Sequence, residues 1–252
     1  MSNFELDTHG YCVMPGALSE RQNGTLLEAV DRVYTSRVQP GEALHELGFV
    51  GLDRRFVELV AHPVTLPVVR RALGWNIHLY HCHLDVHPPL RTDEPEPWRW
   101  HQDGGRQNVE LDSPRPKLSV KVAYFLTDIT GPERGCLWII RGSHLRDVLE
   151  RPADGSVRPV GAEPLLVRAG TAVVFDRRLW HARGDNRSRV TRKALFYGYS
   201  YRWVRPRDEL SLDEAAFFGL DPVRRQLLGA GTSAIGYWIP TEEDVPLRTA
   251  MR

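Results

Sequence analysis

The sequence predicts a mainly β protein (α+β overall), in which antiparallel strands form a sandwich or barrel and helices decorate it. The segment IHLYHCHLDVH at 77–87 alternates between an apolar and a polar face, which is typical of a strand. Several later strand-like segments are separated by turn-forming loops rather than by helices. This order argues against the alternating strand and helix units of a parallel sheet.

Helical patterns precede the first of these strands. Residues 17–34 carry apolar side chains at helical spacing, and Ser19 is a candidate N-cap. Residues 52–73 predict two short helices, interrupted at Pro63 and ended by Gly74.

The chain is expected to form a single domain with three regions. Residues 1–76 form a helical N-terminal support, residues 77–204 the catalytic core, and residues 205–252 a C-terminal extension. The extension begins with two helical segments and ends in a stretch that looks extended. Besides 77–87, core strands are predicted at 117–127, 135–140, 164–168, 171–176 and 190–204.

The composition is that of an ordinary globular protein without a strong global charge. Hydrophobic residues make up 42% of the 252 positions, which is enough for a full core. The 33 lysines and arginines nearly balance the 32 aspartates and glutamates, so no global field favours nucleic acid or a membrane. We therefore expect a small-molecule partner, no nucleic acid or membrane, and a monomer or homodimer.

The cysteines and the N-terminus indicate a reducing compartment. Cys12, Cys82 and Cys136 are widely spaced and odd in number, so they form neither a disulfide framework nor a CxxC zinc site. The first residues lack the basic and apolar regions of a signal peptide, and no apolar run approaches the roughly 20 residues of a membrane helix. These features predict a cytoplasmic protein.

The segment HCHLDVH at 81–87 has the densest set of metal-binding side chains in the sequence. Residues two apart on a strand share a face, so its three histidines and Asp85 point to one side. Binuclear zinc hydrolases carry a related His-x-His-x-Asp signature, but here Val86 is inserted before the last histidine. The segment can therefore be read as a hydrolase motif, a solvent-facing edge strand, or a strand that lines a pocket.

A second His-x-Asp pair lies in WHQDGG at 100–105. Two histidines and one carboxylate on one face hold iron(II) in many oxygen-activating enzymes and leave positions open for other ligands. His101 and Asp103 have the spacing that a strand requires, and the two glycines that follow allow a sharp bend. His181, just after the apolar strand at 171–176, can supply the third ligand.

Arg192 extends this pattern. It lies eleven residues after His181 and opens another predicted strand. A histidine and an arginine at this separation can lie on adjacent antiparallel strands that face one cavity. Arg192 could then hold the far carboxylate of a dicarboxylate whose other end binds the metal.

Three segments resemble the phytanoyl-CoA dioxygenase family of iron(II)/2-oxoglutarate-dependent oxygenases, namely WHQDGG, GPERGCLWIIRGSH and WHARGDNRSRVTRK. The resemblance extends roughly from His81 to Trp203. It implies a double-stranded β-helix, which is a cupin-like jelly roll, with flanking N-terminal and C-terminal helices. It assigns Arg192 to the distal carboxylate of 2-oxoglutarate. The iron ligands that it implies are His101, Asp103 and His181.

The same resemblance implies further contacts around the metal. Asn186 stands where the family commonly has an asparagine, and Tyr124 stands where the family often contacts 2-oxoglutarate. The expected cosubstrate contacts besides Arg192 are therefore Tyr124, His81 and Asn186. The candidate substrate contacts are His83, Asp85 and Arg106.

The implied activity is that of a dioxygenase that binds iron(II), 2-oxoglutarate and O2 and releases succinate and CO2. The expected reaction is hydroxylation of a small polar metabolite or a natural-product intermediate, with desaturation or cyclisation as alternatives. A cupin-type metal-binding isomerase and a jelly roll that only binds a ligand also stay open. Neither of these requires Arg192 to lie opposite the metal.

Overall fold

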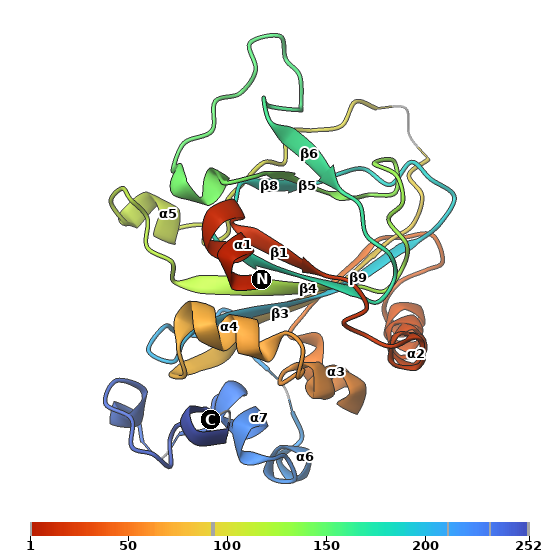
Figure 1. Cartoon of the computed structure of the whole chain (residues 1–252). Coiled ribbons are helices and arrows are strands. Elements are labelled where there is room, and N and C mark those ends of the chain that lie inside the picture. The colour runs from red at the N-terminus through yellow and green to blue at the C-terminus, as the bar shows by residue number, and fades with distance from the viewer. Residues whose placement is uncertain (1, 92–93, 211, 232, 251–252) are drawn as a thin grey trace.

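Two antiparallel β-sheets form the centre of the computed structural model, which describes residues 2–91, 94–210, 212–231 and 233–250 (Figure 1). The larger sheet has the strand order β1–β7–β4–β9–β3–β2, and the smaller sheet has the order β6–β5–β8. The strands are β1 (Tyr11–Met14), β2 (Leu44–Leu47), β3 (Ile77–His87), β4 (Ser119–Phe125), β5 (Leu137–Ile140), β6 (Ala162–Leu165), β7 (Thr171–Asp176), β8 (His181–Arg183) and β9 (Arg192–Tyr201).

Helices flank the sheets, and three of them, α2, α3 and α4, cover one face of the larger sheet (Figure 1). Among the described residues, none of the helices combines the length and the apolar character that crossing a bilayer requires. The α-helices are α1 (Ser2–His9), α2 (Glu20–Arg37), α3 (Arg54–Leu59), α4 (Leu66–Leu73), α5 (Gln107–Glu110), α6 (Glu214–Phe218), α7 (Pro222–Leu227) and α8 (Leu247–Ala250). The 3-10 helices are η1 (Phe49–Leu52), η2 (Ser143–Leu145) and η3 (Ile235–Tyr237).

The ends of the N-terminal helices follow from local chemistry. Ser19 and Gln22 form a capping box at the start of α2, in which each side chain accepts a hydrogen bond from the other residue's backbone N–H. α4 ends at Gly74, whose positive φ of 85° favours glycine. The helices predicted within 17–34 and 52–73 are therefore confirmed.

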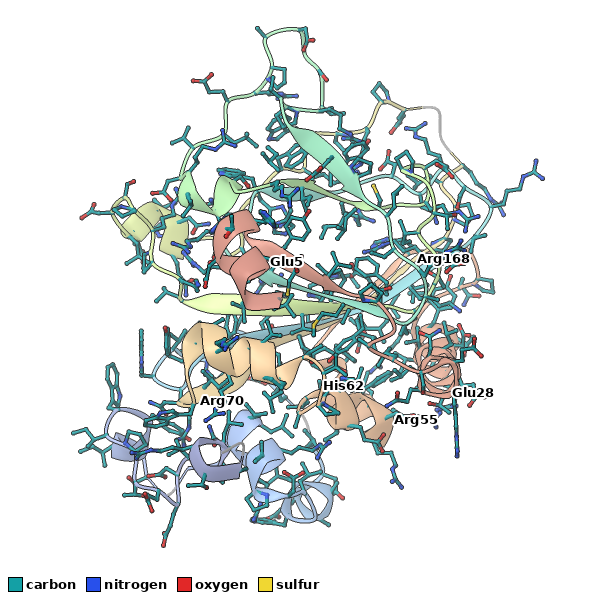
Figure 2. All side chains as sticks on the ribbon, viewed as in Figure 1. Glu5, Glu28, Arg55, His62, Arg70 and Arg168 are labelled. Carbon is teal, nitrogen blue, oxygen red and sulfur yellow. The ribbon has the colours of Figure 1, made fainter. Side chains whose placement is uncertain are left out.

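The main core lies between these helices and the larger sheet. Alternate side chains of β3, β4 and β9 pack there against α2, α3 and α4. Figure 2 shows this layer filled with side chains, and His62 lies within it. The His62 ring meets the ring of Tyr124 edge-on, at a centroid distance of 5.8 Å. Removing this apolar surface from water is the main source of stability for the layer.

A β-bulge in β3 determines which of its side chains face the core. The register against β9 shifts between Leu79 and His81, so Tyr80 is the extra residue. Odd-numbered positions face the helices before the bulge, and even-numbered positions do so after it. The polar residues from His81 onward therefore share the opposite face. Because β3 pairs with both β2 and β9, it is not the solvent-facing edge strand that the sequence also allowed.

A second apolar cluster lies between the two sheets. Phe125, Phe175 and Phe196 of the larger sheet pack there with Leu137 and Ile139 of β5. The predicted mainly β architecture, with antiparallel sheets and flanking helices, is thus confirmed. The division into a support region, a core and an extension stays a prediction.

Some short elements differ from the sequence-based expectation. The sequence does not predict β1 and β2, because four residues are too few to show a clear alternation. β6 begins two residues before the predicted strand at 164–168. The final stretch was expected to be extended, and this is wrong, since it contains η3 and α8. There the backbone N–H of Leu247 donates to Gln226 of α7, so the segment packs on a helix and adds no strand to a sheet.

Candidate active site

A cavity of about 380 Å³ lies between the two sheets, on the face of the larger sheet that points away from the helices. Both His-x-Asp segments of the sequence line it, so they belong to one site. The lining residues are His45, His81, His83, Asp85, His87, His101, Asp103, Lys121, Leu137, Phe175, His181, Arg183, Arg192, Phe196 and Arg207.

His101 and His181 lie side by side in this cavity. The backbone N–H of each donates to the carbonyl of the other at 3.0 Å, and the ring centroids are 4.3 Å apart. Nδ1 of His101 lies 2.9 Å from the carbonyl of Arg99, and Nδ1 of His181 lies 2.8 Å from that of Leu179. A carbonyl can only accept a hydrogen bond, so each Nδ1 carries the proton. Nε2 of both rings is left with a free lone pair for a metal.

A tight turn holds Asp103 beside these rings. Its backbone N–H donates to the carbonyl of Arg177 at 2.8 Å. Gly104 and Gly105 follow with φ values of +121° and +50°, a region that favours glycine. A Cβ on Gly104 would also meet Nη1 of the buried Arg177, whose guanidinium would have to shift to make room for it. The predicted bend after the His-x-Asp pair is therefore present.

The ligand atoms of His101, Asp103 and His181 lie within 4.8 Å of one another. Burial alone would raise the pKa of Asp103, but Lys121 and the two histidines hold it well below its usual range. Burial lowers the pKa of His181 to about 3, so this ring is neutral at pH 7, as a metal ligand must be. Oδ1 of Asp103 accepts a hydrogen bond from Nζ of Lys121, and among the described residues Oδ2 has only the ion pair with the same Nζ, at 2.8 Å, and no hydrogen bond. Two imidazoles and one carboxylate fit a divalent ion such as iron(II).

Arg192 opens β9 in the same cavity and is almost completely buried. Its guanidinium lies 5.6 Å from the ring centre of Phe125 and 5.8 Å from that of Phe196. Within the described part of the chain, its Nε and Nη1 have no hydrogen-bond partner. The nearest carboxylate contact, from Nη1 to Oδ2 of Asp85, is 3.8 Å long. Arg192 therefore has free donors with which to bind the carboxylate of a ligand.

The first residues of HCHLDVH form a hydrogen-bonded row along the cavity wall. Asp208 accepts a hydrogen bond from Nδ1 of His81 and another from the backbone N–H of Cys82, each 2.7 Å long. Nε2 of His81 then accepts from Nδ1 of His83 at 3.0 Å. The His83 ring stacks on Phe196, with centroids 4.4 Å apart. Burial lowers the pKa of both histidines, so both are neutral at pH 7.

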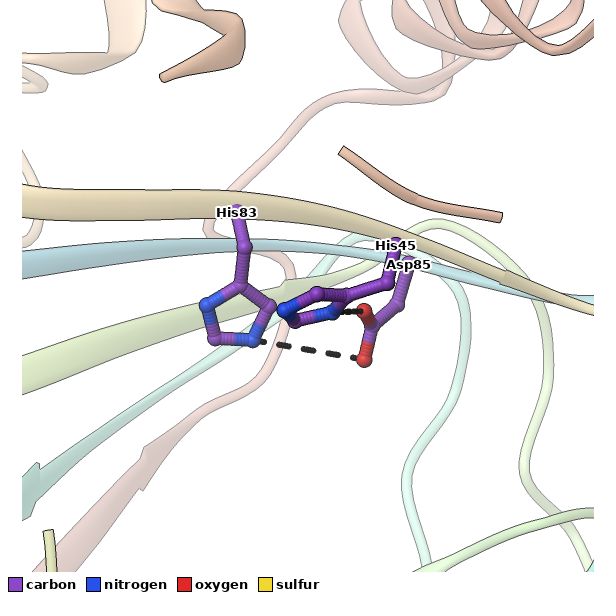
Figure 3. Close-up of side chains that lie close together, drawn as sticks. All are labelled: His45, His83 and Asp85. Atoms are coloured by element: carbon purple, nitrogen blue, oxygen red, sulfur yellow. Dashed lines mark hydrogen bonds and ion pairs between the residues drawn. The ribbon is translucent and has the colours of Figure 1, made fainter. Parts of the chain in front are cut away.

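His45, His83 and Asp85 form a second group whose spacing could accommodate a metal ion (Figure 3). His45 of β2 pairs with Asp85 across the sheet, and its Nδ1 lies 2.7 Å from Oδ1. Oδ2 of Asp85 lies 3.4 Å from Nε2 of His87 and 3.8 Å from Nη1 of Arg192. Burial would raise the pKa of Asp85, but hydrogen bonds from His45 and His87 hold it well below its usual range. In this group Nδ1 of His45 contacts the carboxylate itself, whereas in the first group Nδ1 of both histidines contacts a backbone carbonyl and Nε2 is left for a metal, which favours the first group as the metal centre.

The predicted contact of Tyr124 with the cosubstrate is wrong. Tyr124 lies on the face of β4 that meets the helices, where its hydroxyl is 2.7 Å from Oγ1 of Thr65. Residues two apart on a strand share a face, so the cavity side of β4 carries Lys121, Ala123 and Phe125 instead. Neighbouring side chains on a strand point to opposite faces, so a shift of one position separates Tyr124 from the cavity side of β4.

Asn186 and Arg106 do not line the cavity either. The amide of Asn186 donates to the carbonyls of His87 and Val190, so this side chain shapes the loop before β9. Arg106 pairs with Glu110 on the surface, where its side chain is 80% exposed. The contacts predicted for them are corrected accordingly. The other predicted site residues do line the cavity, namely His81, His83, Asp85, His101, Asp103, His181 and Arg192.

Several lining residues are not predicted from the sequence. Lys121 had a usable signal, because it is the only charged residue in the apolar strand β4. His45 had none, because it lies 40 positions from its partner Asp85. Asp208 does not line the cavity itself, and it had no signal either, because it binds His81 from 127 positions away. Arg183 and Arg207 also line the cavity, and one arginine among many in the sequence carries no distinguishing pattern.

A family model and two curated relatives match most of the chain. The family model for phytanoyl-CoA dioxygenase (PhyH) matches residues 6–194. Two curated relatives, from Mycobacterium bovis and Mycobacterium tuberculosis, are each described as an uncharacterized protein. Each is 28% identical over 243 residues, a match that covers 89% of this chain and 84% of the relative.

Solved structures share the fold. HygX from Streptomyces hygroscopicus, with nickel and 2-oxoglutarate bound, has a TM-score of 0.67 and 18% identity, covering 85% of this chain and 91% of its own. The non-heme α-ketoglutarate-dependent carbocyclase SnoK from nogalamycin biosynthesis has a TM-score of 0.63 and 25% identity, covering 88% and 90%. The epimerase SnoN, in complex with Fe3+ and α-ketoglutarate, has a TM-score of 0.64 and 20% identity, covering 88% and 91%. The predicted double-stranded β-helix is confirmed by these matches.

Proposed function

Because the chain belongs to the phytanoyl-CoA dioxygenase family, we propose that it is a dioxygenase that depends on iron(II) and 2-oxoglutarate. One observation carries the proposal. His101, Asp103 and His181 share a cavity with Arg192, whose guanidinium has free donors among the described residues. A cupin-type isomerase or a jelly roll that only binds a ligand would not require that guanidinium.

In this proposal His101, Asp103 and His181 would hold iron(II) in the cavity. The bound iron supplies the centre at which O2 is activated while 2-oxoglutarate is converted to succinate and CO2. Arg192 binds the C5 carboxylate of 2-oxoglutarate. The phenyl rings beside its guanidinium keep water away from this charge pair, which strengthens it.

We propose that the substrate is a small polar metabolite or a natural-product intermediate, which the enzyme hydroxylates. His81, His83 and Asp85 give one cavity wall a polar surface. The volume of about 380 Å³ is near the lower end for small-molecule sites and must also admit the cosubstrate. HygX, which shares the fold, has been crystallised with nickel, 2-oxoglutarate and hygromycin B bound. A cytoplasmic monomer or homodimer is proposed with this function.

Cyclisation is a second candidate reaction, because SnoK, at 25% identity, is a carbocyclase. Screening succinate release against a panel of metabolites would identify the substrate, since turnover reports its fit. Mass spectrometry of the product then separates the two reactions. Hydroxylation adds one oxygen atom, whereas ring closure removes two hydrogen atoms.

Anaerobic addition of iron(II) and 2-oxoglutarate tests the proposal without a known substrate. We expect the visible charge-transfer band of the chelate in the wild-type protein and its loss in Asp103→Ala. Asp112→Ala is the matched control, because this exposed aspartate lies outside the cavity, and its band should be retained. A wild-type protein without the band, or an unchanged band in Asp103→Ala, would contradict the proposal.

A further inference from the structure

Lys121 places a buried positive charge beside the candidate metal centre. It is the only charged residue of β4, and it is 7% exposed. Its Nζ lies 2.8 Å from each of the carboxylate oxygens of Asp103. The ammonium group therefore lies at the carboxylate through which Asp103 would bind a metal ion.

Asp103 is the only carboxylate that lies within 4 Å of Lys121 in the described part of the chain. The other contact of Nζ is with the ring of Phe175, whose centre is 5.9 Å away. A buried ammonium requires an anionic or hydrogen-bonding partner, because leaving water is costly for a charge. A metal ion that binds Asp103 must therefore share this carboxylate with Lys121, which has no other close carboxylate among the described residues.

We propose that Lys121 is a positioning residue that couples metal binding to 2-oxoglutarate binding. Without a metal, Lys121 neutralises Asp103. With a metal bound, the ion and the ammonium repel each other at short range in a poorly solvated cavity. The C1 carboxylate of 2-oxoglutarate relieves this repulsion, so the cosubstrate strengthens metal binding and the metal strengthens cosubstrate binding equally.

The charges at the centre support this role. A divalent ion, the Asp103 carboxylate and the Lys121 ammonium together carry two net positive charges. Without Lys121 the same centre would carry one positive charge and would attract an incoming carboxylate less strongly. The inference rests on the proposed function, because it takes 2-oxoglutarate as the ligand.

Calorimetric titration with Ni(II), with and without 2-oxoglutarate, measures this coupling in the absence of turnover. In the wild-type protein we expect 2-oxoglutarate to tighten Ni(II) binding. Lys121→Met keeps the length of the side chain without its charge. We expect it to bind Ni(II) alone about tenfold more tightly and to lose about tenfold of the effect of 2-oxoglutarate, a typical coupling between sites.

Two controls separate charge from structure. Lys121→Arg keeps the positive charge and should retain the coupling. Lys117→Met removes a lysine that pairs with the exposed Asp7 outside the cavity, and it should change neither affinity. Circular dichroism checks the fold of each variant, and Lys121→Gln replaces Lys121→Met if the latter does not fold.

The possible outcomes test the role of Lys121 and the proposed function separately. Equal coupling in the wild type and in Lys121→Met overturns the role of Lys121 and leaves the proposed function intact. Weaker Ni(II) binding in Lys121→Met also overturns it, because Lys121 would then only hold Asp103 in place. A wild-type protein that does not bind 2-oxoglutarate, or binds it without any effect on Ni(II), overturns both proposals.

Discussion

Arg192 is buried at the start of β9, and in the described residues two of its guanidinium nitrogens have no partner. A buried donor without an acceptor costs about 1–3 kcal/mol. Asp85 offsets this cost only in part, because its Oδ2 is 3.8 Å from Nη1 and too far away for a hydrogen bond. A bound carboxylate would supply the missing acceptors, so the site is arranged for an anion.

Replacing Arg192 with methionine should weaken 2-oxoglutarate binding by roughly 100-fold, because losing one partner of a buried charge pair typically costs 2–5 kcal/mol. Ni(II) binding in the absence of 2-oxoglutarate should change little, since Arg192 is not among the proposed ligands. Arg192→Lys should recover part of the affinity, because lysine restores the charge without the two-pronged geometry. Calorimetry measures both ligands. Unchanged affinity for 2-oxoglutarate in Arg192→Met would remove this residue from the cosubstrate site.

At the scale of elements, β3 and the segment after β9 form one wall of the cavity together. The bulge at Tyr80 exchanges the two faces of β3. Before the bulge the odd-numbered residues pack on the helices, and after it the odd-numbered residues are polar and line the cavity. The segment that follows β9 then returns across β3. The backbone N–H of Arg207 donates to the carbonyl of Tyr80, and Asp208 binds both His81 and the backbone of Cys82. Asp208 thus holds the segment after β9 against the strand that forms the pocket wall.

Asp208→Ala should lower the free energy of unfolding by about 2–4 kcal/mol, because it leaves two buried donors without their charged acceptor. Ni(II) affinity should stay close to that of the wild type, since His81 is not a proposed ligand. Denaturant unfolding and calorimetry measure the two effects separately. Asp213→Ala, an exposed aspartate of the same extension, is the matched control and should have little effect on stability. Equal stability of both variants would mean that Asp208 does not hold the segment in place.

At the scale of the whole molecule, buried neutral histidines link stability to pH. Burial lowers their pKa values in the folded protein, whereas in the unfolded chain a histidine titrates near 6.5. Below that pH the unfolded chain therefore binds more protons than the folded protein, so stability falls as the pH falls. The histidines with lowered pKa values are His62, His78, His81, His83, His87, His144 and His181.

His78 allows a test of this link outside the metal centre. Burial lowers its pKa to about 4, so its contribution to stability should be lost as the pH falls from about 6.5 to about 4. His78→Gln should reduce the slope of unfolding free energy against pH by roughly 1.2 kcal/mol per pH unit between pH 6 and 5. Denaturant unfolding of the metal-free protein in a chelator measures this slope. A stability that does not change between pH 7 and 5 would show that these histidines are not held neutral.

Elements that depend on neighbouring residues can be predicted from the sequence, whereas elements that depend on residues distant in the sequence cannot. β3 and β7 lie at the predicted residues because strand alternation and apolar runs are visible over neighbouring positions. The short strands β1 and β2 were missed because they are held by their partners in the sheet. The placement of Tyr124 was wrong because the face of a strand depends on its register, and a shift of one position reverses it.

The sequence by itself determined the His-x-Asp pair and its bend, because alternation along a strand and the freedom of glycine act over a few residues. The family resemblance predicted that HCHLDVH lies beside the metal site, and the tertiary structure shows both His-x-Asp segments lining a single cavity. The tertiary structure alone placed Lys121 against Asp103 and His45 against Asp85. Those neighbours come from different strands, and strand order, the bulge in β3 and the return of the chain after β9 bring them together. HCHLDVH therefore forms a wall of the cavity, whereas WHQDGG supplies the candidate metal ligands.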